Sequence, residues 1–248
     1  YFVQFSYNGM SYHGWQNQPN AITVQQVLEA SFSTLLKTPL ALVGAGRTDT
    51  GVHAKQMFAH FDNDEIADIN NLTYRLNALL PDDIAVQKIF EVSDEAHARF
   101  DATQRTYKYV VTQEKNPFYF DSAHFVKLPL NVEKMNEAAA LLLQYEDFEC
   151  FSKSKTDVHT YLCDIKKAEW SKKEDVLVFT IIANRFLRNM VRAIVGTLLD
   201  VGLGKRALAD VKAVINSKDR SMAGVSVPAK GLYLTKISYP DTIIPKHG

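Results

Sequence analysis

Apolar residues recur along this chain with two periods, and the changes between them predict an ordered series of strands and helices. Alternation of apolar and polar residues indicates a strand, whereas apolar residues three and four positions apart indicate an amphipathic helix. Over the first hundred residues the pattern predicts strands at 1–7, 40–46, 57–61 and 84–91, a helix beginning after Thr23 and a helix over 72–80. Thr23 and Gln26 have the spacing of a capping box, and Pro81 ends the second helix.

A connector at 92–103 follows, and a similar order of elements then begins again. The pattern predicts strands at 104–113, 161–170, 176–183 and 232–239, and helices beginning after Asn131, at about 185–199 and at 207–215. The chain is therefore expected to have an α+β fold made of two ferredoxin-like (βαββαβ) halves, 1–103 and 104–248. We expect the halves to form a combined, largely antiparallel sheet with a central active-site cleft.

Composition then limits the class of protein. No apolar run approaches the roughly 20 residues of a transmembrane helix, so no membrane association is expected. Lysine plus arginine and aspartate plus glutamate both number 28, which argues against non-specific coating of nucleic acid but permits a locally basic cleft. Cys150 and Cys163 lack a Cys-x-x-Cys spacing, so we expect reduced, structural cysteines in a cytoplasmic protein without a bound metal.

The stretch 44–54, Gly-Ala-Gly-Arg-Thr-Asp-Thr-Gly-Val-His-Ala, lies between two predicted strands and carries Asp49. In most Asp-x-Gly turns the carboxylate only binds its own backbone. Glycines also let a turn approach a ligand closely, so Asp49 is also a candidate catalytic acid. A Walker loop is excluded because Val52 and His53 stand where lysine and serine or threonine are needed.

Two other segments contain candidate chemistry. Strand alternation places Arg105, Tyr107 and Tyr109 on one face, where a ring is able to stack on a base or simply to pack. The predicted helix at 185–199 gathers polar and small side chains on one side, without a paired acid in the stripe. Its members are Arg185, Arg188, Asn189, Arg192 and Gly196. Arginine suits phosphates and carboxylates, so we expect Arg192 to be the ion partner of Asp49.

Together these segments resemble the tRNA pseudouridine synthase A family, the tRNA pseudouridine(38-40) synthases. The resemblance covers nearly the whole chain and is most specific at Arg-Thr-Asp-Thr-Gly-Val-His-Ala, residues 47–54. The other matching segments are Tyr12-His13-Gly14-Trp15-Gln16, Ala98-Arg99-Phe100, Arg105-Thr106-Tyr107-Lys108-Tyr109, Asn189-Met190-Val191-Arg192 and Gly231-Leu232-Tyr233-Leu234. Ser226-Val227 and the loop at 152–160 depart from the family pattern.

The resemblance implies isomerisation of uridine to pseudouridine in the anticodon stem-loop of tRNA by a homodimer, without a cofactor or metal. It assigns Asp49 as the nucleophile, Tyr107 as the residue that stacks on the target uracil and Arg192 as the partner of the aspartate. We also expect Arg47, His53, Arg185 and Arg188 to contact the RNA. Attack at C1′, attack at C6 and assistance of glycal formation are all compatible with one aspartate.

Two readings from other classes compete with this one. A non-catalytic RNA-binding module would also use sheet aromatics, but this chain lacks the Gly-Phe-type signature that such sheets carry, and a binding module would not need Asp49. A homodimeric aspartic protease would use Asp49-Thr50-Gly51 from each chain. Two such acids must share a proton, and Arg47 beside each copy would keep both ionised.

Overall fold

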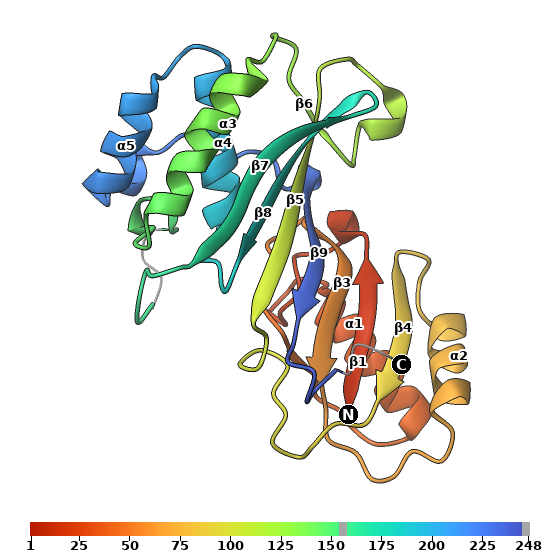
Figure 1. Ribbon diagram of the computed structural model, residues 1–248. Coiled ribbons are helices and arrows are strands. Elements are labelled where there is room, and N and C mark those ends of the chain that lie inside the picture. Colours follow the sequence, from red (N-terminus) through yellow and green to blue (C-terminus); the bar gives the residue numbers. More distant parts are fainter. Residues whose placement is uncertain (154–157, 245–248) are drawn as a thin grey trace. The chain divides into compact units, whose positions relative to one another are not determined.

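A computed structural model describes residues 1–153 and 158–244 of the chain, which divides into two compact units (Figure 1). Unit 1 contains Tyr1–Thr103 together with Tyr233–Gly248, and unit 2 contains Gln104–Leu232. The sequence pattern had placed all of 104–248 in the second half. The difference arises because the last strand pairs with unit 1, a long-range choice that a local pattern does not contain. None of the helices in the described ranges is long and apolar enough to cross a membrane.

Unit 1 has the predicted order of elements. Its strands are β1 (Phe2–Tyr7), β2 (Val43–Gly44), β3 (His53–His60), β4 (Ile84–Phe90) and most of β9 (Leu232–Ser238), and its helices are α1 (Val24–Leu36) and α2 (Ile69–Leu79). Strand β1 is antiparallel to both β4 and β3, and β2 is antiparallel to the end of β3. Strand β9 runs parallel to the beginning of β3, where His53 lies opposite Tyr233.

Helix α1 begins where its cap predicts. The Thr23 hydroxyl accepts a hydrogen bond from the Gln26 backbone N–H at 3.2 Å, which satisfies one of the free amides of the first turn. Phe32 of this helix packs against Phe61, with ring centroids 5.1 Å apart. These buried rings fix the helix on the sheet that carries the 44–54 stretch.

Unit 2 contains an antiparallel sheet covered by helices on one side (Figure 1). Its strands are β5 (Gln104–Thr112), β6 (His124–Phe125), β7 (Ile165–Lys173) and β8 (Val176–Ala183), and its helices are α3 (Val132–Leu141), α4 (Met190–Gly202) and α5 (Leu208–Ser217). Strand β8 lies between β5 and β7, and the short β6 runs parallel to the end of β5. Helix α4 is the most deeply buried of the three, because nearly all its residues are apolar or small.

The bounds of several predicted elements differ from the structure. The run at 40–46 forms only the two-residue strand β2, and β3 begins four residues earlier than the pattern indicated. The helix expected from 185 begins instead at Met190. Asn184 explains why the helix begins later than predicted. Its side-chain oxygen accepts hydrogen bonds from the backbone N–H groups of Asp164 and Arg185 and holds an irregular turn before the helix.

Candidate active site

Asp49 lies half-buried in the loop between β2 and β3, and hydrogen bonds fix residues on both sides of it. The Thr48 hydroxyl hydrogen-bonds the Tyr7 hydroxyl at 2.8 Å, and the Thr48 carbonyl accepts from the Trp15 N–H at 3.3 Å. On the other side, the Gly51 N–H donates to the Tyr12 carbonyl at 3.3 Å. The acid is therefore presented by a loop that is held from both ends.

Two glycines make this arrangement possible because segment 9–15 packs directly on the loop. A Cβ on Gly14 would lie 2.3 Å from the Thr48 carbonyl oxygen, and a Cβ on Gly9 would lie 2.0 Å from that of Val52. Gly14 also has a φ of +84°, a backbone conformation that other residues rarely adopt. The Tyr12-His13-Gly14-Trp15-Gln16 motif thus has a structural reason: it forms the support of the Asp49 loop.

His53 also helps to hold the segment that supports the Asp49 loop. It is buried, its Nδ1 accepts from the Gly9 N–H at 3.2 Å, and its ring stacks on Tyr233 with centroids 4.6 Å apart. Lys55 places its Nζ 5.5 Å from the centroid of that tyrosine ring. Contact of His53 with RNA stays a prediction. Arg47, two residues before the acid, is exposed.

In unit 2, Tyr107 is half-buried on β5 opposite Ile181 of β8. The ring of Phe186 packs edge-on against it, with centroids 5.2 Å apart and an interplanar angle of 88°. Tyr109, two residues further along the strand, is fully buried, and its hydroxyl donates to the Pro228 carbonyl at 2.9 Å. Of the two tyrosines predicted on this face, Tyr109 is buried and Tyr107 keeps part of its side chain exposed.

The arginines expected on one helix are divided between two elements. Arg185 and Arg188 lie in the turn before α4, and Arg192 lies in its first helical turn. Asn189 ends the turn with a φ of +66°, so the helical stripe predicted through 185–192 does not form. This corrects the expected helix, while the turn itself carries both Phe186 against Tyr107 and the exposed Arg188.

Arg192 donates from Nε to the Val227 carbonyl at 2.7 Å, and the Val227 N–H donates to the Arg192 carbonyl at 3.3 Å. The sequence reasoning missed both Phe186 and Val227 as neighbours of site residues. Phe186 could have been found from its place between two arginines. Val227 gave no signal, because its contribution is a backbone carbonyl.

The candidate residues therefore form two groups. Arg47, Asp49 and His53 belong to unit 1, while Tyr107, Arg185, Arg188 and Arg192 belong to unit 2. Within unit 2 the structure brings Tyr107 together with the turn that carries Arg185 and Arg188. The ion pair of Asp49 and Arg192 stays a prediction, because its partners belong to different units.

The two cysteines are unsuited to nucleophilic catalysis. Both are free thiols in the core of unit 2. Burial raises the pKa of the Cys150 thiol to about 12 and that of the Cys163 thiol to about 11. A thiol acts as a nucleophile through its thiolate, which is scarce at neutral pH when the pKa is so high. Asp49 remains the better candidate.

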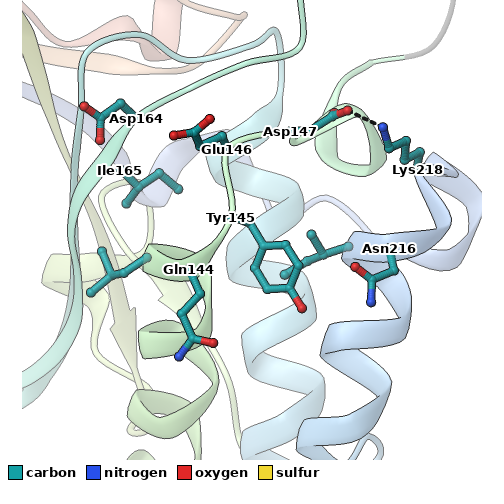
Figure 2. A pocket seen from close by; sticks show the side chains of 10 residues that line it. Gln144, Tyr145, Glu146, Asp147, Asp164, Ile165, Asn216 and Lys218 are labelled. Atoms are coloured by element: carbon teal, nitrogen blue, oxygen red, sulfur yellow. Dashed lines mark hydrogen bonds and ion pairs between the residues drawn. The ribbon is translucent and has the colours of Figure 1, made fainter.

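A hollow elsewhere in unit 2 contains none of the candidate residues (Figure 2). It has a volume of about 510 Å³ and is lined by Glu146, Asp147 and Asp164 among others. Lys218 pairs with Asp147 at 2.6 Å, and this hydrogen bond lowers the pKa of that carboxyl. Three acids suit RNA phosphates poorly. Among residues 1–153 and 158–244, no His, Cys, Asp or Glu side chains form a group of three that could hold a metal ion.

Comparison with known proteins supports the resemblance seen in the sequence. A family model described as tRNA pseudouridine synthase matches residues 4–101 and 138–240. The tRNA pseudouridine synthase A of Parabacteroides distasonis is 53% identical over 246 residues, which are 99% of this chain and 98% of that protein. The protein of the same name from Bacillus licheniformis is 41% identical over 238 residues, 94% of this chain and 96% of its own. The similarity extends through both units.

Proposed function

This chain belongs to the tRNA pseudouridine synthase family, and from that premise we propose that it isomerises uridine to pseudouridine in the anticodon stem-loop of tRNA, at positions 38, 39 and 40. One observation carries the proposal. The Arg-Thr-Asp-Thr-Gly-Val-His-Ala segment of a full-length family match lies on a loop whose neighbours are fixed on both sides of Asp49. A rigid loop is what a positioned catalytic group requires.

The reaction breaks the bond between C1′ and N1 of uridine, turns the base and forms a bond between C1′ and C5. The C5 hydrogen leaves as a proton and N1 gains one, so no electrons are exchanged and no redox cofactor is needed. Asp49 acts as the nucleophile, and Arg192 is its ion partner. A carboxylate that loses water to a bound substrate stays charged only beside a positive or hydrogen-bonding group.

Tyr107 stacks on the target uracil, which must leave the stem-loop before it can react. Phe186 supports this role, because its edge-on contact fixes the tyrosine ring from one side. Arg47, Arg185 and Arg188 bind phosphates of the displaced nucleotide. His53, at the start of β3 beside the Asp49 loop, also contacts the RNA. Such contacts predict tRNA binding that weakens steeply with salt.

The protein works as a cytoplasmic homodimer in this proposal, with each tRNA contacting both subunits. The assembly rests on the family resemblance, and sedimentation of the protein at micromolar concentration tests it. A mass equal to that of one chain would contradict it.

The function is tested by release of tritium from unmodified tRNA labelled at C5 of uridine. Pseudouridine has the same mass as uridine, so this assay detects what a mass measurement misses. We expect wild type to release tritium and Asp49→Asn to do so at least about a thousandfold more slowly, with unchanged tRNA binding. Asp64→Asn, at an exposed position of the same unit, is the matched control and should behave as wild type.

Two outcomes would contradict this account. An Asp49→Asn variant that kept about a tenth of the wild-type rate would remove Asp49 from the nucleophile's role. If wild type and Asp49→Asn both bound tRNA and neither released tritium, the result would instead support a non-catalytic RNA-binding module.

A further inference from the structure

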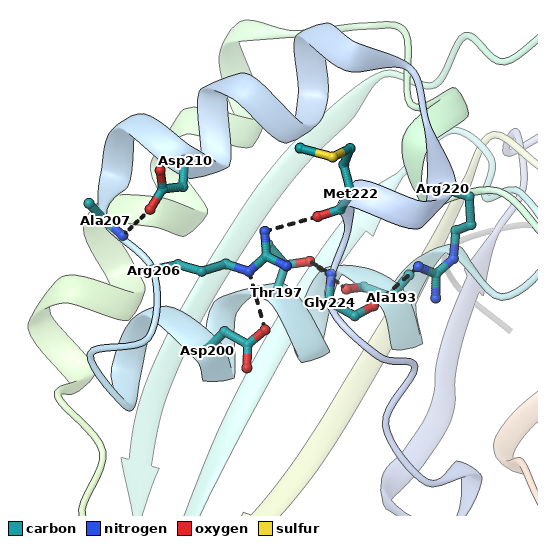
Figure 3. Close-up of polar contacts among 9 residues, drawn as sticks. All are labelled: Ala193, Thr197, Asp200, Arg206, Ala207, Asp210, Arg220, Met222 and Gly224. Carbon is teal, nitrogen blue, oxygen red and sulfur yellow. Dashed lines mark hydrogen bonds and ion pairs between the residues drawn. The ribbon is translucent and has the colours of Figure 1, made fainter.

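Residues 224–228 of unit 2 lie directly on helix α4, and glycines on both sides permit the contact. A Cβ on Gly196 would lie 1.9 Å from the Val225 carbonyl oxygen, and a Cβ on Gly224 would lie 2.6 Å from the Thr197 nitrogen. The Gly224 N–H donates to the Thr197 hydroxyl at 2.9 Å, which in turn donates to the Ala193 carbonyl at 3.0 Å (Figure 3). The segment is therefore attached to the helix that carries Arg192.

Two arginines hold this segment and the residues just before it (Figure 3). Arg206 donates from Nη1 to the Met222 carbonyl at 2.9 Å, and Arg220 donates from Nη1 to the Gly224 carbonyl at 3.2 Å. Arg220 also donates from Nη2 to the Ser226 hydroxyl oxygen at 2.8 Å. That oxygen accepts a second hydrogen bond from the Asn189 side-chain amide at 2.6 Å. Ser226 thus joins the segment to the residue that precedes α4.

The far end of the segment meets two elements of the candidate site. The Val227 carbonyl accepts from Arg192 Nε at 2.7 Å, and the next carbonyl, that of Pro228, accepts from the Tyr109 hydroxyl at 2.9 Å. Tyr109 lies on the same strand as Tyr107. Two successive carbonyls therefore connect the strand that carries the stacking tyrosine to the helix that carries the arginine.

We propose that residues 224–228, which we call the brace, set the orientation of the Arg192 guanidinium for catalysis, and that Ser226 is a positioning residue that acts through it. The inference rests on the proposed function of Arg192. A guanidinium is planar, so a hydrogen bond from Nε to a fixed carbonyl determines the plane in which the two terminal nitrogens lie. The Val227 N–H bond to the Arg192 carbonyl holds Val227 on one side, and Ser226, the residue before it, has two further hydrogen bonds that fix this part of the segment.

Ser226 is half-buried, which separates positioning from folding. Its removal leaves the donors of Asn189 and Arg220 without the hydroxyl, but water can reach this position and hydrate them. We therefore expect Ser226→Ala to change stability little. The carbonyl of Val227 gains freedom, and a misplacement of about 1 Å at a catalytic group is enough to lower a rate by about a hundredfold.

The experiment measures tritium release, tRNA binding and thermal unfolding on the full chain. We expect Ser226→Ala to lower kcat by about tenfold to a hundredfold, with KM within about twofold of wild type. Ser226→Thr keeps the hydroxyl and should restore the rate. Thr34→Ala removes an exposed, hydrogen-bonded hydroxyl from α1 of unit 1 and should leave the rate unchanged. If Ser226→Ala does not fold, Ser226→Cys takes its place in the experiment, because it keeps nearly the same side-chain volume but has a weaker hydrogen-bond acceptor.

A second background separates positioning from a general structural role. Lysine has no Nε–H to bind the Val227 carbonyl, so Ser226→Ala in an Arg192→Lys background should cost less than about twofold. An equal loss of rate in both backgrounds, or a Ser226→Ala rate equal to wild type, would overturn the positioning role of the brace and leave the proposed function intact. Absence of tritium release by wild type would overturn the proposed function itself. A fully active Arg192→Lys would show that Arg192 needs no such orientation.

Discussion

Arg192 uses its Nε, an atom for which lysine has no equivalent, to bind the Val227 carbonyl. Substitution by lysine would keep the positive charge but lose both the planar fork and the contact that orients it. The distinction separates two roles for the residue, a point charge near a carboxylate and an oriented donor pair.

We therefore predict that Arg192→Lys lowers kcat on the order of a hundredfold while tRNA binding changes little. Tritium release under single-turnover conditions measures the rate, and a filter-binding titration measures the affinity. Lys212→Arg, at an exposed position on α5, is the reverse substitution and serves as a control for the exchange of one cation for another. Normal turnover by Arg192→Lys would contradict the prediction and would show that a positive charge alone is enough at this position.

At the scale of single elements, the end of β3 is held to the segment at 97–101 by histidine. The His60 Nδ1 accepts from the Ala98 N–H at 3.1 Å, and its ring lies 4.5 Å from that of His97. Burial, followed by the neighbouring His97, lowers the pKa of His60 below its usual value. The folded protein therefore favours the neutral ring, which is also the form that can accept this hydrogen bond.

The sign of the pH dependence follows from this lowered pKa. The contribution of neutral His60 to the free energy of unfolding is fully present above the unfolded-state histidine pKa of about 6.5. It is lost as the pH falls through the lower folded-state pKa. We predict that the free energy of unfolding in urea falls more gently below pH 6.5 in His60→Gln than in wild type. His13→Gln, at an exposed position, should follow the wild-type curve. Parallel curves for wild type and His60→Gln would contradict the prediction.

Elements whose ends depend on neighbouring residues were predictable from the sequence. Helix α1 begins at its Thr23 cap, and β8 (Val176–Ala183) has the predicted bounds, because caps and alternation are local signals. The start of α4 was not predictable from helical spacing. It depends on the Asn184 side chain, which binds the backbone of a residue twenty positions earlier.

The candidate site divides in the same way. Asp49 and Tyr107 became candidates from the sequence because a motif and a strand pattern point to them directly. The brace was not, since its contribution lies in backbone carbonyls and in glycines whose partners are distant along the chain. Chemistry that resides in side chains is visible in a sequence, whereas the geometry that supports it depends on the fold.

At the scale of the whole molecule, the chain leaves unit 1 after Thr103 and returns to it at Tyr233. The returning strand β9 places Tyr233 on His53, the residue that supports the Asp49 loop. Each unit has one of the two tryptophans, Trp15 in unit 1 and Trp170 in unit 2, and both are buried. Their fluorescence therefore reports on the two units separately.

We predict that a chain ending at Leu232 loses order in unit 1 while unit 2 keeps its fold. In this truncated chain, Trp170→Phe leaves the Trp15 signal, which should shift to the red as the residue becomes exposed. Trp15→Phe leaves the Trp170 signal, which should stay as in the full chain. A truncation that altered both signals equally would show that the units do not fold independently.

The return of β9 also sets an order of events on the ribosome. Strand β1 is translated long before β9, so its sheet is incomplete until residues 232–238 have been made. Unit 2 is contiguous in the message and has all its residues before that strand emerges. Unit 1, whose first strands are translated before any part of unit 2, is thus completed after unit 2, and a nascent chain does not acquire its finished Asp49 support until β9 has been made.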